Sequence, residues 1–437
     1  MSYPLWEVPF LGGGLLIAIV AVVHVFISQF AVGGGLFLAL TERKGREAGD
    51  KAWLAYLKRH TKVFLIVSAL LGNVTGVGIW FTIALINPQG TSILIRTFVW
   101  GWAIEWCFFM IEVAAILLYY YGWDRIDAKL HQLIGWIYAG ASILTMAVIN
   151  GILSFMLTPG RWLETGSFWH GFLNPGYLPS LVMRGGAALA LAGLYGLVTS
   201  TVLSDGPLKE RLGKWTSKFI LVAFGLFATG GLWYLFVVPA GARELAMGGA
   251  APVTIMNAMT IIISMIVLTA TYFGPFRRPG FTSVTFAAVL LTLGLLATGG
   301  AEWVREGIRK PFIIYDYVYS NGTFATQQKD PKGILTQARW SVYGDIARAP
   351  DKVAGGEDVF RIQCASCHTV QGYNGVGPLV KGWTADFAAH QIDRLQMLKG
   401  YMPPFLGNEA ERDALAAYLV SLNDTPKEAK ANATAKP

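Results

Sequence analysis

Charged residues are scarce in this 437-residue sequence. Asp, Glu, Lys and Arg together make up 14% of it, whereas hydrophobic residues make up 54%. A soluble protein of this length and composition would expose far more apolar surface than it could tolerate. The shortage of charge therefore argues against a soluble globular protein and predicts a membrane protein.

Eight apolar stretches are long enough to cross the roughly 30 Å hydrocarbon core of a bilayer as helices. Buried helices of a large soluble protein are the alternative, but the short polar loops between the stretches favour membrane spans. The predicted spans cover residues 10–40, 63–86, 98–121, 132–157, 181–203, 216–239, 253–273 and 282–301. We expect an all-α fold, with a helical membrane domain over residues 1–306.

Lys and Arg are divided unevenly between the loops that would join these spans. One set of alternate loops contains Arg43, Lys44, Arg46, Lys51, Lys58, Arg59, Lys62, Arg125, Lys129, Lys209, Arg211, Lys214, Lys218, Arg277 and Arg278, and the other contains Arg96, Arg161, Arg184 and Arg243. Because basic residues accumulate in cytoplasmic loops, both termini are expected on the outer side, which is the periplasm in a Gram-negative cell. The net charge of +8 then reflects topology, and no nucleic-acid partner is expected.

The N-terminus does not have the pattern of a cleaved signal peptide. It begins with Glu7 and no basic region, and its apolar run is too long for a cleaved signal. We interpret the first span as an uncleaved anchor in a bacterial plasma membrane.

Cysteine is also rare. Two of the three cysteines lie in the motif Cys364-Ala365-Ser366-Cys367-His368, and the third, Cys107, lies inside a predicted span. A zinc site needs more ligands than one such pair offers, and a redox dithiol is the other alternative. Two thiols three positions apart, followed by histidine, are typical of covalent attachment of a c-type haem with the histidine as proximal iron ligand.

The composition changes after residue 301, where the apolar runs stop. We expect a periplasmic linker over residues 307–350, a haem domain over 351–424 and a disordered, charged tail over 425–437. The sixth iron ligand is predicted to be Met402, in Gly-Tyr-Met-Pro-Pro, with Met397 as the alternative. The motif, the Gly-Pro pair at 377–378 and a closing helix at 409–422 resemble single-haem class I cytochromes c.

Histidine is too rare for two common classes of membrane haem protein. The six histidines are His24, His60, His131, His170, His368 and His390, and only His24 lies well inside a span. Two-haem cytochrome b bundles and haem–copper oxidases need more intramembrane histidines than this, so both are excluded. A lone intramembrane histidine is either a hydrogen-bonded structural residue or a ligand, and the cost of ionisable groups in a bilayer favours the ligand.

Four glutamates share that argument. Glu105 and Glu112 lie seven residues apart on the third span, hence on one face. They are candidate catalytic residues that carry protons toward a buried redox centre, or neutral acids that join helices. Glu302 and Glu306 lie at the outer end of the eighth span and are either surface residues or weak haem-iron ligands.

The membrane part, roughly residues 10–312, resembles the large subunit of cytochrome bd quinol oxidases. The resemblance rests on His24-Val25-Phe26, Gly122-Trp123-Asp124-Arg125, Asn150-Gly151 and Glu306-Gly307-Ile308-Arg309-Lys310-Pro311-Phe312. It implies that His24 and Glu306 ligate non-covalent high-spin haems of b or d type, with Glu112 and Glu105 nearby. It also implies a possible quinone and a second helical membrane subunit as partner.

The sequence departs from this family in several places. Where the family has a histidine ligand of a low-spin haem, in the fifth span, this chain has Arg184, and Met259 or Met256 would stand for the second ligand. The long quinol-binding loop is reduced to residues 240–252, the spacing of Glu105 and Glu112 is one residue shorter, and the haem domain replaces a ninth helix. These departures put the low-spin haem and the quinol site in doubt.

Three functions fit these observations. The first is a bd-like oxidoreductase that uses periplasmic c-type cytochromes in place of quinol and reduces oxygen or a similar small acceptor. The second is a quinol–cytochrome c electron-transfer subunit. The third is a non-catalytic membrane anchor for a c haem.

Overall fold

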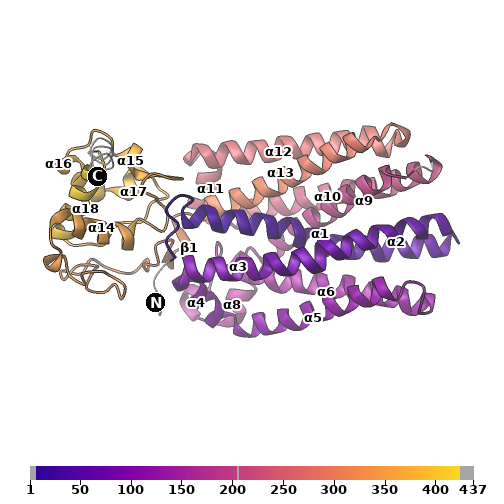
Figure 1. The fold of residues 1–437 in the computed structure, drawn as a ribbon, viewed down its shortest axis with the longest axis horizontal. Helices are drawn as coiled ribbons and strands as arrows, with labels where there is room; N and C mark the ends of the chain where they lie inside the picture. The colour runs from indigo at the N-terminus through magenta and orange to yellow at the C-terminus, as the bar shows by residue number, and fades with distance from the viewer. Residues whose placement is uncertain (1–5, 204–205, 424–437) are drawn as a thin grey trace, which may run out of the picture. The chain divides into compact units, whose positions relative to one another are not determined.

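The protein is described by a computed structural model that covers residues 6–203 and 206–423 (Figure 1). Its contacts divide the chain into two compact units. The bundle unit contains Val20–Ile79 and Leu94–Arg309, and the C-terminal unit contains Met1–Ile19, Trp80–Ile93 and Lys310–Pro437. Nearly all regular structure is helical, so the all-α prediction is confirmed.

Among the described residues, eight helices are long and apolar enough to cross a membrane, which confirms the eight predicted spans. The spans are α1 (Gly13–Glu47), the continuous run of α2 (Lys51–Leu65), η1 (Ile66–Leu71) and α3 (Gly72–Ile86), α5 (Val99–Tyr121), α6 (Ala128–Phe155), α9 (Tyr177–Thr201), α10 (Gly206–Val237), α12 (Ala251–Thr271) continued by η3 (Tyr272–Phe276), and α13 (Val284–Arg309). Short helices lie between them: α4 (Pro88–Thr97), α7 (Trp162–Thr165), α8 (Phe168–Phe172), α11 (Ala240–Glu244), η2 (Leu245–Gly249) and η4 (Pro279–Phe281).

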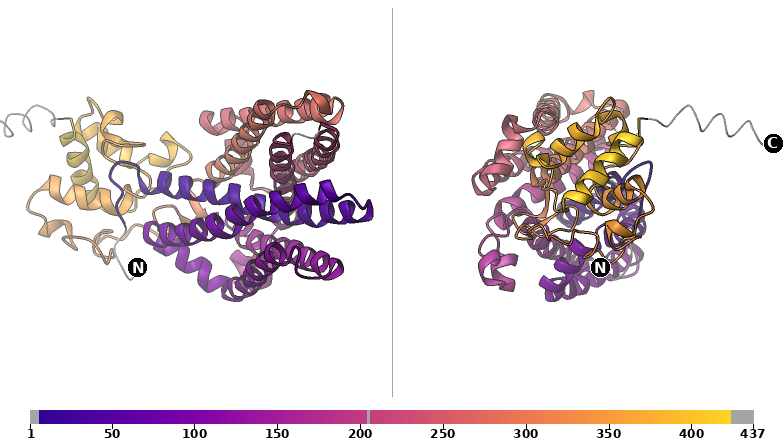
Figure 2. Two further views of the ribbon diagram at one scale, coloured as in Figure 1. Left: turned by 45° about the vertical axis from the view of Figure 1, so that its right-hand side comes forward. Right: turned by 90° about the vertical axis from the view of Figure 1, so that its left-hand side faces the viewer.

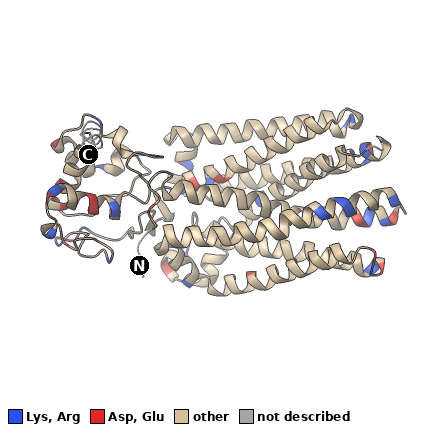
Figure 3. Cartoon of the chain, in the orientation of Figure 1, with Lys and Arg blue, Asp and Glu red and all other residues tan. Residues whose placement is uncertain are grey.

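The first two spans are longer than predicted at the end that carries most of the basic residues. Residues that were expected in a loop, such as Lys44 and Lys58, lie on α1 and α2. The turn between these helices is short because the Asp50 side chain caps α2 by accepting a hydrogen bond from the Trp53 amide. Figure 3 shows Lys and Arg gathered at this end of the bundle.

Helix α9 is packed among α10, α13 and α6 within the bundle (Figures 1 and 2). Glycine allows the backbones to approach closely, as is common between membrane helices. A Cβ atom on Gly33 of α1 would lie 2.0 Å from the Ala188 carbonyl oxygen of α9, and one on Gly186 would lie 2.7 Å from the Ala223 oxygen of α10. Larger side chains at these two positions would force the helices apart.

The C-terminal unit has its own hydrophobic core. Its elements are β1 (Phe312–Ile314) paired antiparallel with β2 (Val318–Tyr319), η5 (Ile346–Arg348), α14 (Lys352–Gln363), α15 (Val376–Leu379), α16 (Ala385–Ile392), α17 (Leu395–Leu398) and α18 (Glu409–Ser421). Helices α14 and α18 pack closely, since a Cβ atom on Gly356 would lie 2.0 Å from the Ala414 oxygen. The predicted closing helix corresponds to α18.

The segment expected to be a linker is folded onto the haem domain. Leu335 is fully buried in the same core as α14 and α18. The backbone N–H groups of Ile334 and Leu335 each donate to the Glu411 carboxylate at 2.9 Å, and Glu411 is 1% exposed. The 307–350 segment, although rich in Gly, Pro and polar residues, is therefore not an extended linker around Leu335. The tail predicted over 425–437 lies outside the described residues.

The same unit includes the N-terminal segment and the end of α3. The Tyr373 amide donates to the Phe10 carbonyl at 2.9 Å, and the Asn87 side chain donates to the Ser320 carbonyl at 3.1 Å. The loop that follows the haem-attachment motif is thus hydrogen-bonded to the residues directly preceding α1.

Candidate functional site

The haem-attachment motif forms a tight turn at the end of α14. The amides of Cys367 and His368 both donate to the Cys364 carbonyl, at 3.1 and 2.9 Å. This turn brings the two thiols and the histidine together within five residues. Burial raises the pKa of the Cys364 thiol to about 12, so the unmodified thiol is neutral in an apolar setting.

The ring of His368 is oriented for iron binding. Its Nδ1 lies 3.0 Å from the Asn374 carbonyl oxygen, which can only accept, so Nδ1 carries the proton and Nε2 keeps its lone pair. Burial lowers the pKa of His368 below its usual value, although the Asn374 carbonyl acts in the opposite direction. A neutral histidine with a free Nε2 is the form that ligates iron, and the motif therefore fits a covalent c haem.

The two candidates for the sixth ligand differ in exposure. Met397 lies on α17 with its side chain 77% exposed, whereas Met402 is half-buried and its amide donates to the Lys399 carbonyl at 2.9 Å. A haem ligand must face the interior of the domain, so the geometry favours Met402.

His24 is held in the tautomer that a metal ligand needs. The Thr75 hydroxyl donates to the Leu71 carbonyl at 2.7 Å, so its oxygen accepts from His24 Nδ1 at 3.0 Å. This arrangement leaves the lone pair of Nε2 for another partner. Gly76 keeps room beside the ring, because a Cβ atom there would lie 3.3 Å from His24 Cε1. His24 therefore fits a haem ligand.

Glu105 and Glu112 lie on α5 close enough for their carboxyl groups to interact electrostatically. Glu112 Oε1 is buried and has no hydrogen-bond partner among the described residues. An unsatisfied buried carboxyl oxygen is costly, and protonation of the group or contact with a bound molecule would relieve the cost. The pair can therefore hold at least one proton inside the bundle.

Arg184 does not lie in a loop, as counted from the sequence, but inside α9, where it joins an ion cluster with α13. Arg184 Nη1 lies 3.2 Å from Glu302 Oε1, and Arg305 Nε lies 2.8 Å from Glu302 Oε2. The exposed fractions of the Arg184 and Glu302 side chains are 8% and 14%. Glu302 is thus the anion of a buried cluster rather than a surface residue.

Glu306, the second predicted haem ligand of the membrane part, is paired with an arginine. Arg309 Nη2 donates to both carboxylate oxygens of Glu306, at 2.6 Å to Oε1, and the Arg309 side chain is 4% exposed. Glu306 is half of an ion pair in this structure, and its role as a haem ligand stays a prediction.

Comparison with known proteins places these geometries in a family. The family model described as cytochrome bd terminal oxidase subunit I matches residues 15–234, just over half of the chain. The chain belongs to this family. A second model, described as cytochrome c oxidase, cbb3-type, subunit III, matches residues 351–419. Both resemblances predicted from sequence are thereby confirmed.

Among solved structures, the bd oxidase from Geobacillus thermodenitrificans shares the fold. The similarity has a TM-score of 0.61 at 18% sequence identity and covers 69% of this chain and 87% of that chain. No curated protein matches the chain. A bd-family subunit with a cytochrome c domain is a membrane-bound haem oxidoreductase subunit of a respiratory chain.

In this bd-family subunit, the region expected to hold the low-spin haem does not fit it. An arginine guanidinium has only hydrogen-bond donors and offers no lone pair to iron, and Arg184 is paired with Glu302. Of the methionines proposed as the second ligand, Met259 is 49% exposed and Met256 is half-buried beside Gly300 of α13. Without the histidine ligand, neither methionine completes a low-spin site.

A buried polar cluster around Glu42 in this bd-family subunit was not predicted from the sequence. His131 Nδ1 lies 2.7 Å from Glu42 Oε1, the Tyr119 hydroxyl donates to Glu42 Oε2 at 2.8 Å, and Arg46 also pairs with Glu42. The Glu42 and His131 side chains are fully buried. The available signal for Glu42 was its position directly after a long apolar run. His131 was predicted to lie just outside a span, so its pairing with Glu42 could not be predicted.

Proposed function

We propose that this bd-family subunit belongs to an oxidoreductase that exchanges electrons with a c-type donor in place of quinol. A covalent haem on Cys364 and Cys367 would be the point of exchange, and oxygen or a similar small molecule would be reduced at a high-spin haem bound by His24. The observation that carries the proposal is the Arg184–Glu302 ion pair, because the sequence resemblance predicts the family's low-spin haem ligand at position 184. Electrons would then enter through the c haem instead of through a low-spin haem.

The bound haems would supply electron transfer and, at His24, the binding of the small acceptor. The chain's own contribution is orientation. Asn374 sets the tautomer of His368, and Thr75 sets the tautomer of His24. The hydrogen bond from the Tyr373 amide to the Phe10 carbonyl supports a haem-attachment loop that is held against the segment before α1.

Reduction of oxygen consumes protons, and the two half-buried acids of α5 are suited to hold them. Glu112 has an unsatisfied buried oxygen, and Glu105 lies within electrostatic reach of it. We assign to this pair the delivery of protons toward the haem at His24.

The proposal includes the cellular setting. The distribution of Lys and Arg supports a plasma-membrane protein with both termini and the haem domain on the outer side. Periplasmic c-type cytochromes would then be the electron partners. A second helical subunit would cover apolar flanks of the bundle, as the family resemblance implies.

The test begins with a haem count on the purified full chain, by pyridine haemochrome analysis, followed by oxygen consumption with reduced cytochrome c or with quinol. We expect c haem together with non-covalent haem, and activity with cytochrome c. The His24→Ala variant should lose non-covalent haem and keep the c haem.

His170→Ala is the matched control, because His170 also contacts a threonine hydroxyl, at 2.8 Å, but lies outside the spans. Its haem content should equal that of the wild type. Full non-covalent haem in His24→Ala, or c haem alone in the wild type, would contradict the proposal. Reduction of the c haem by quinol, without oxygen consumption, would point to a quinol–cytochrome c function.

A further inference from the structure

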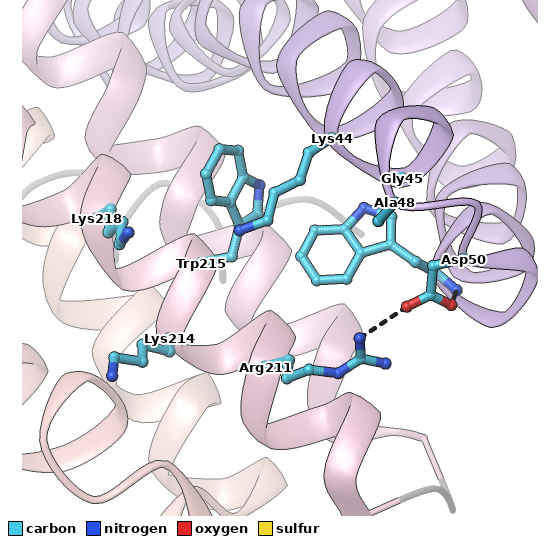
Figure 4. Close-up of a pocket in the computed structure, with 9 residues that line it drawn as sticks. Lys44, Gly45, Ala48, Asp50, Arg211, Lys214, Trp215 and Lys218 are labelled. Atoms are coloured by element: carbon cyan, nitrogen blue, oxygen red, sulfur yellow. Dashed lines mark hydrogen bonds and ion pairs between the residues drawn. The ribbon is translucent and has the colours of Figure 1, made fainter.

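A pocket of about 200 Å³ opens at the end of the bundle that carries most basic residues (Figure 4). It lies between the last turns of α1, the start of α2 and the first half of α10. Its nine described lining residues are Lys44, Gly45, Ala48, Asp50, Trp53, Arg211, Lys214, Trp215 and Lys218. Neither the family resemblance nor the proposed function uses this pocket.

The pocket carries a surplus of positive charge. Four of the nine lining residues are cationic, and Asp50 is the one acid among them. Asp50 accepts from Arg211 at 2.7 Å, the contact drawn dashed in Figure 4. The Trp53 amide and then Arg211 lower the pKa of Asp50 below its usual value, so this acid is ionised at neutral pH. The three lysines remain as the uncompensated charge of the lining.

Two tryptophans form a rigid aromatic wall. The Trp53 indole donates to the Thr41 carbonyl at 2.9 Å, and the Trp215 indole donates to the Thr41 hydroxyl at 3.0 Å. Thr41 is fully buried, so both rings are fixed. Lys44 Nζ lies 4.1 Å from the centre of the Trp215 ring, within cation–π range. Tryptophan and lysine side by side are typical of the headgroup level of a membrane.

Below the pocket, the exposed face of α10 changes from basic to apolar within one turn. Lys214, Lys218, Val222 and Leu226 follow one another at intervals of four residues and therefore lie along one stripe of the helix. All four are exposed, Val222 at 58% and Leu226 at 37%. A soluble anion would use the lysines alone, whereas a lipid would also cover the apolar half of this stripe.

We propose that this pocket binds the phosphate of an anionic glycerophospholipid. Lys44 and Lys218 contact the phosphate, the two tryptophans flank the headgroup, and an acyl chain lies along Val222 and Leu226. The charge of the pocket selects anionic over zwitterionic lipid, since each basic residue near an anionic lipid surface adds a favourable interaction. The inference is independent of the proposed electron-transfer function.

The experiment is native mass spectrometry of the purified full chain titrated with phosphatidylglycerol or with phosphatidylcholine. We expect one tightly held phosphatidylglycerol with at least about tenfold preference over phosphatidylcholine. The variant Lys44→Gln/Lys218→Gln should weaken phosphatidylglycerol binding about 30-fold, because each lysine contributes about fivefold. The single variant Lys218→Gln, on an exposed position, should show the smaller loss and guards against misfolding of the double variant.

The matched control is Lys62→Gln/Lys129→Gln, which removes two exposed cations from helices α2 and α6 outside the pocket. It should bind phosphatidylglycerol as the wild type does. Equal loss in both double variants would show a general surface effect and overturn the proposal. Equal affinity for phosphatidylcholine would do the same, and so would full displacement of the lipid by millimolar inorganic phosphate, which would identify a soluble anion as the ligand.

Discussion

Replacing Glu302 should destabilise the bundle more than replacing Arg184, because one carboxylate pairs with two arginines, of which Arg184 is buried and Arg305 half-buried. In Glu302→Gln, both arginines lose this anionic partner while Arg184 stays buried, and breaking a buried pair costs about 3–5 kcal/mol. In Arg184→Gln, Glu302 keeps the shorter contact to Arg305, at 2.8 Å. The loss is then that of one charge-assisted hydrogen bond, about 1.5–3 kcal/mol.

The double variant Arg184→Gln/Glu302→Gln completes a mutant cycle. Since the two residues share one cluster, its destabilisation should fall short of the sum of the single effects by about 1–2 kcal/mol. The free energies come from equilibrium unfolding of the purified full chain in mixed micelles, followed by tryptophan fluorescence. Arg43→Gln is the control, since Arg43 belongs to an exposed pair with Glu47 and should leave the unfolding midpoint unchanged.

The same variants test whether a low-spin haem is missing from this region. The haem count of Arg184→Gln should equal that of the wild type, because an arginine held by Glu302 is not a ligand. Strictly additive free energies, or a larger effect of Arg184→Gln than of Glu302→Gln, would refute the cluster as a unit. Loss of a b-type haem from Arg184→Gln would refute the absence of the low-spin site.

Three further outcomes are expected. Met402→Ala should remove the methionine-to-iron charge-transfer absorption of the oxidised c haem, whereas Met397→Ala, at a position 77% exposed, should keep it. Glu411→Gln should weaken two buried backbone hydrogen bonds by about 1.5–3 kcal/mol, and trypsin should cut the 330–340 segment of the intact chain roughly 10- to 100-fold faster, with Glu409→Gln as the unchanged control. Glu112→Gln should slow oxygen consumption at least about tenfold at unchanged haem content, and wild-type turnover in that variant would remove the acid from the proton route.

The spans could be predicted because each is a local feature: about 20 apolar residues are sufficient evidence for a helix across a bilayer. The helix ends could not be located as well, since α1 and α2 continue into basic segments that a hydropathy criterion assigns to loops. Asp50 caps α2 and so ends the loop early, but a single Asp between Gly49 and Lys51 is a weak sequence signal.

The ion cluster could not be predicted, because its partners come from α9 and α13 and only the packing of those helices brings them together. Arg184 was recognised as a departure from the family, but its pairing with Glu302 requires the three-dimensional structure. The 307–350 segment was misleading for the same reason. Ile334 and Leu335 are two apolar residues in a polar stretch, and the carboxylate that accepts from their backbone amides, Glu411, lies on the last described helix. The c-haem motif, in contrast, is contiguous and was found at once.

The hydrogen bonds that join the C-terminal residues to two earlier segments of the chain have a mechanical consequence. Tyr373 is tied to Phe10 before α1, and Ser320 is tied to Asn87 directly after α3. Within the C-terminal unit, the haem-attachment loop and the residue following β2 are therefore connected to these segments by hydrogen bonds as well as through the chain. A protein that docks against the haem-attachment loop and displaces it must break the hydrogen bond between Tyr373 and Phe10, so docking would be felt by the residues that directly precede α1.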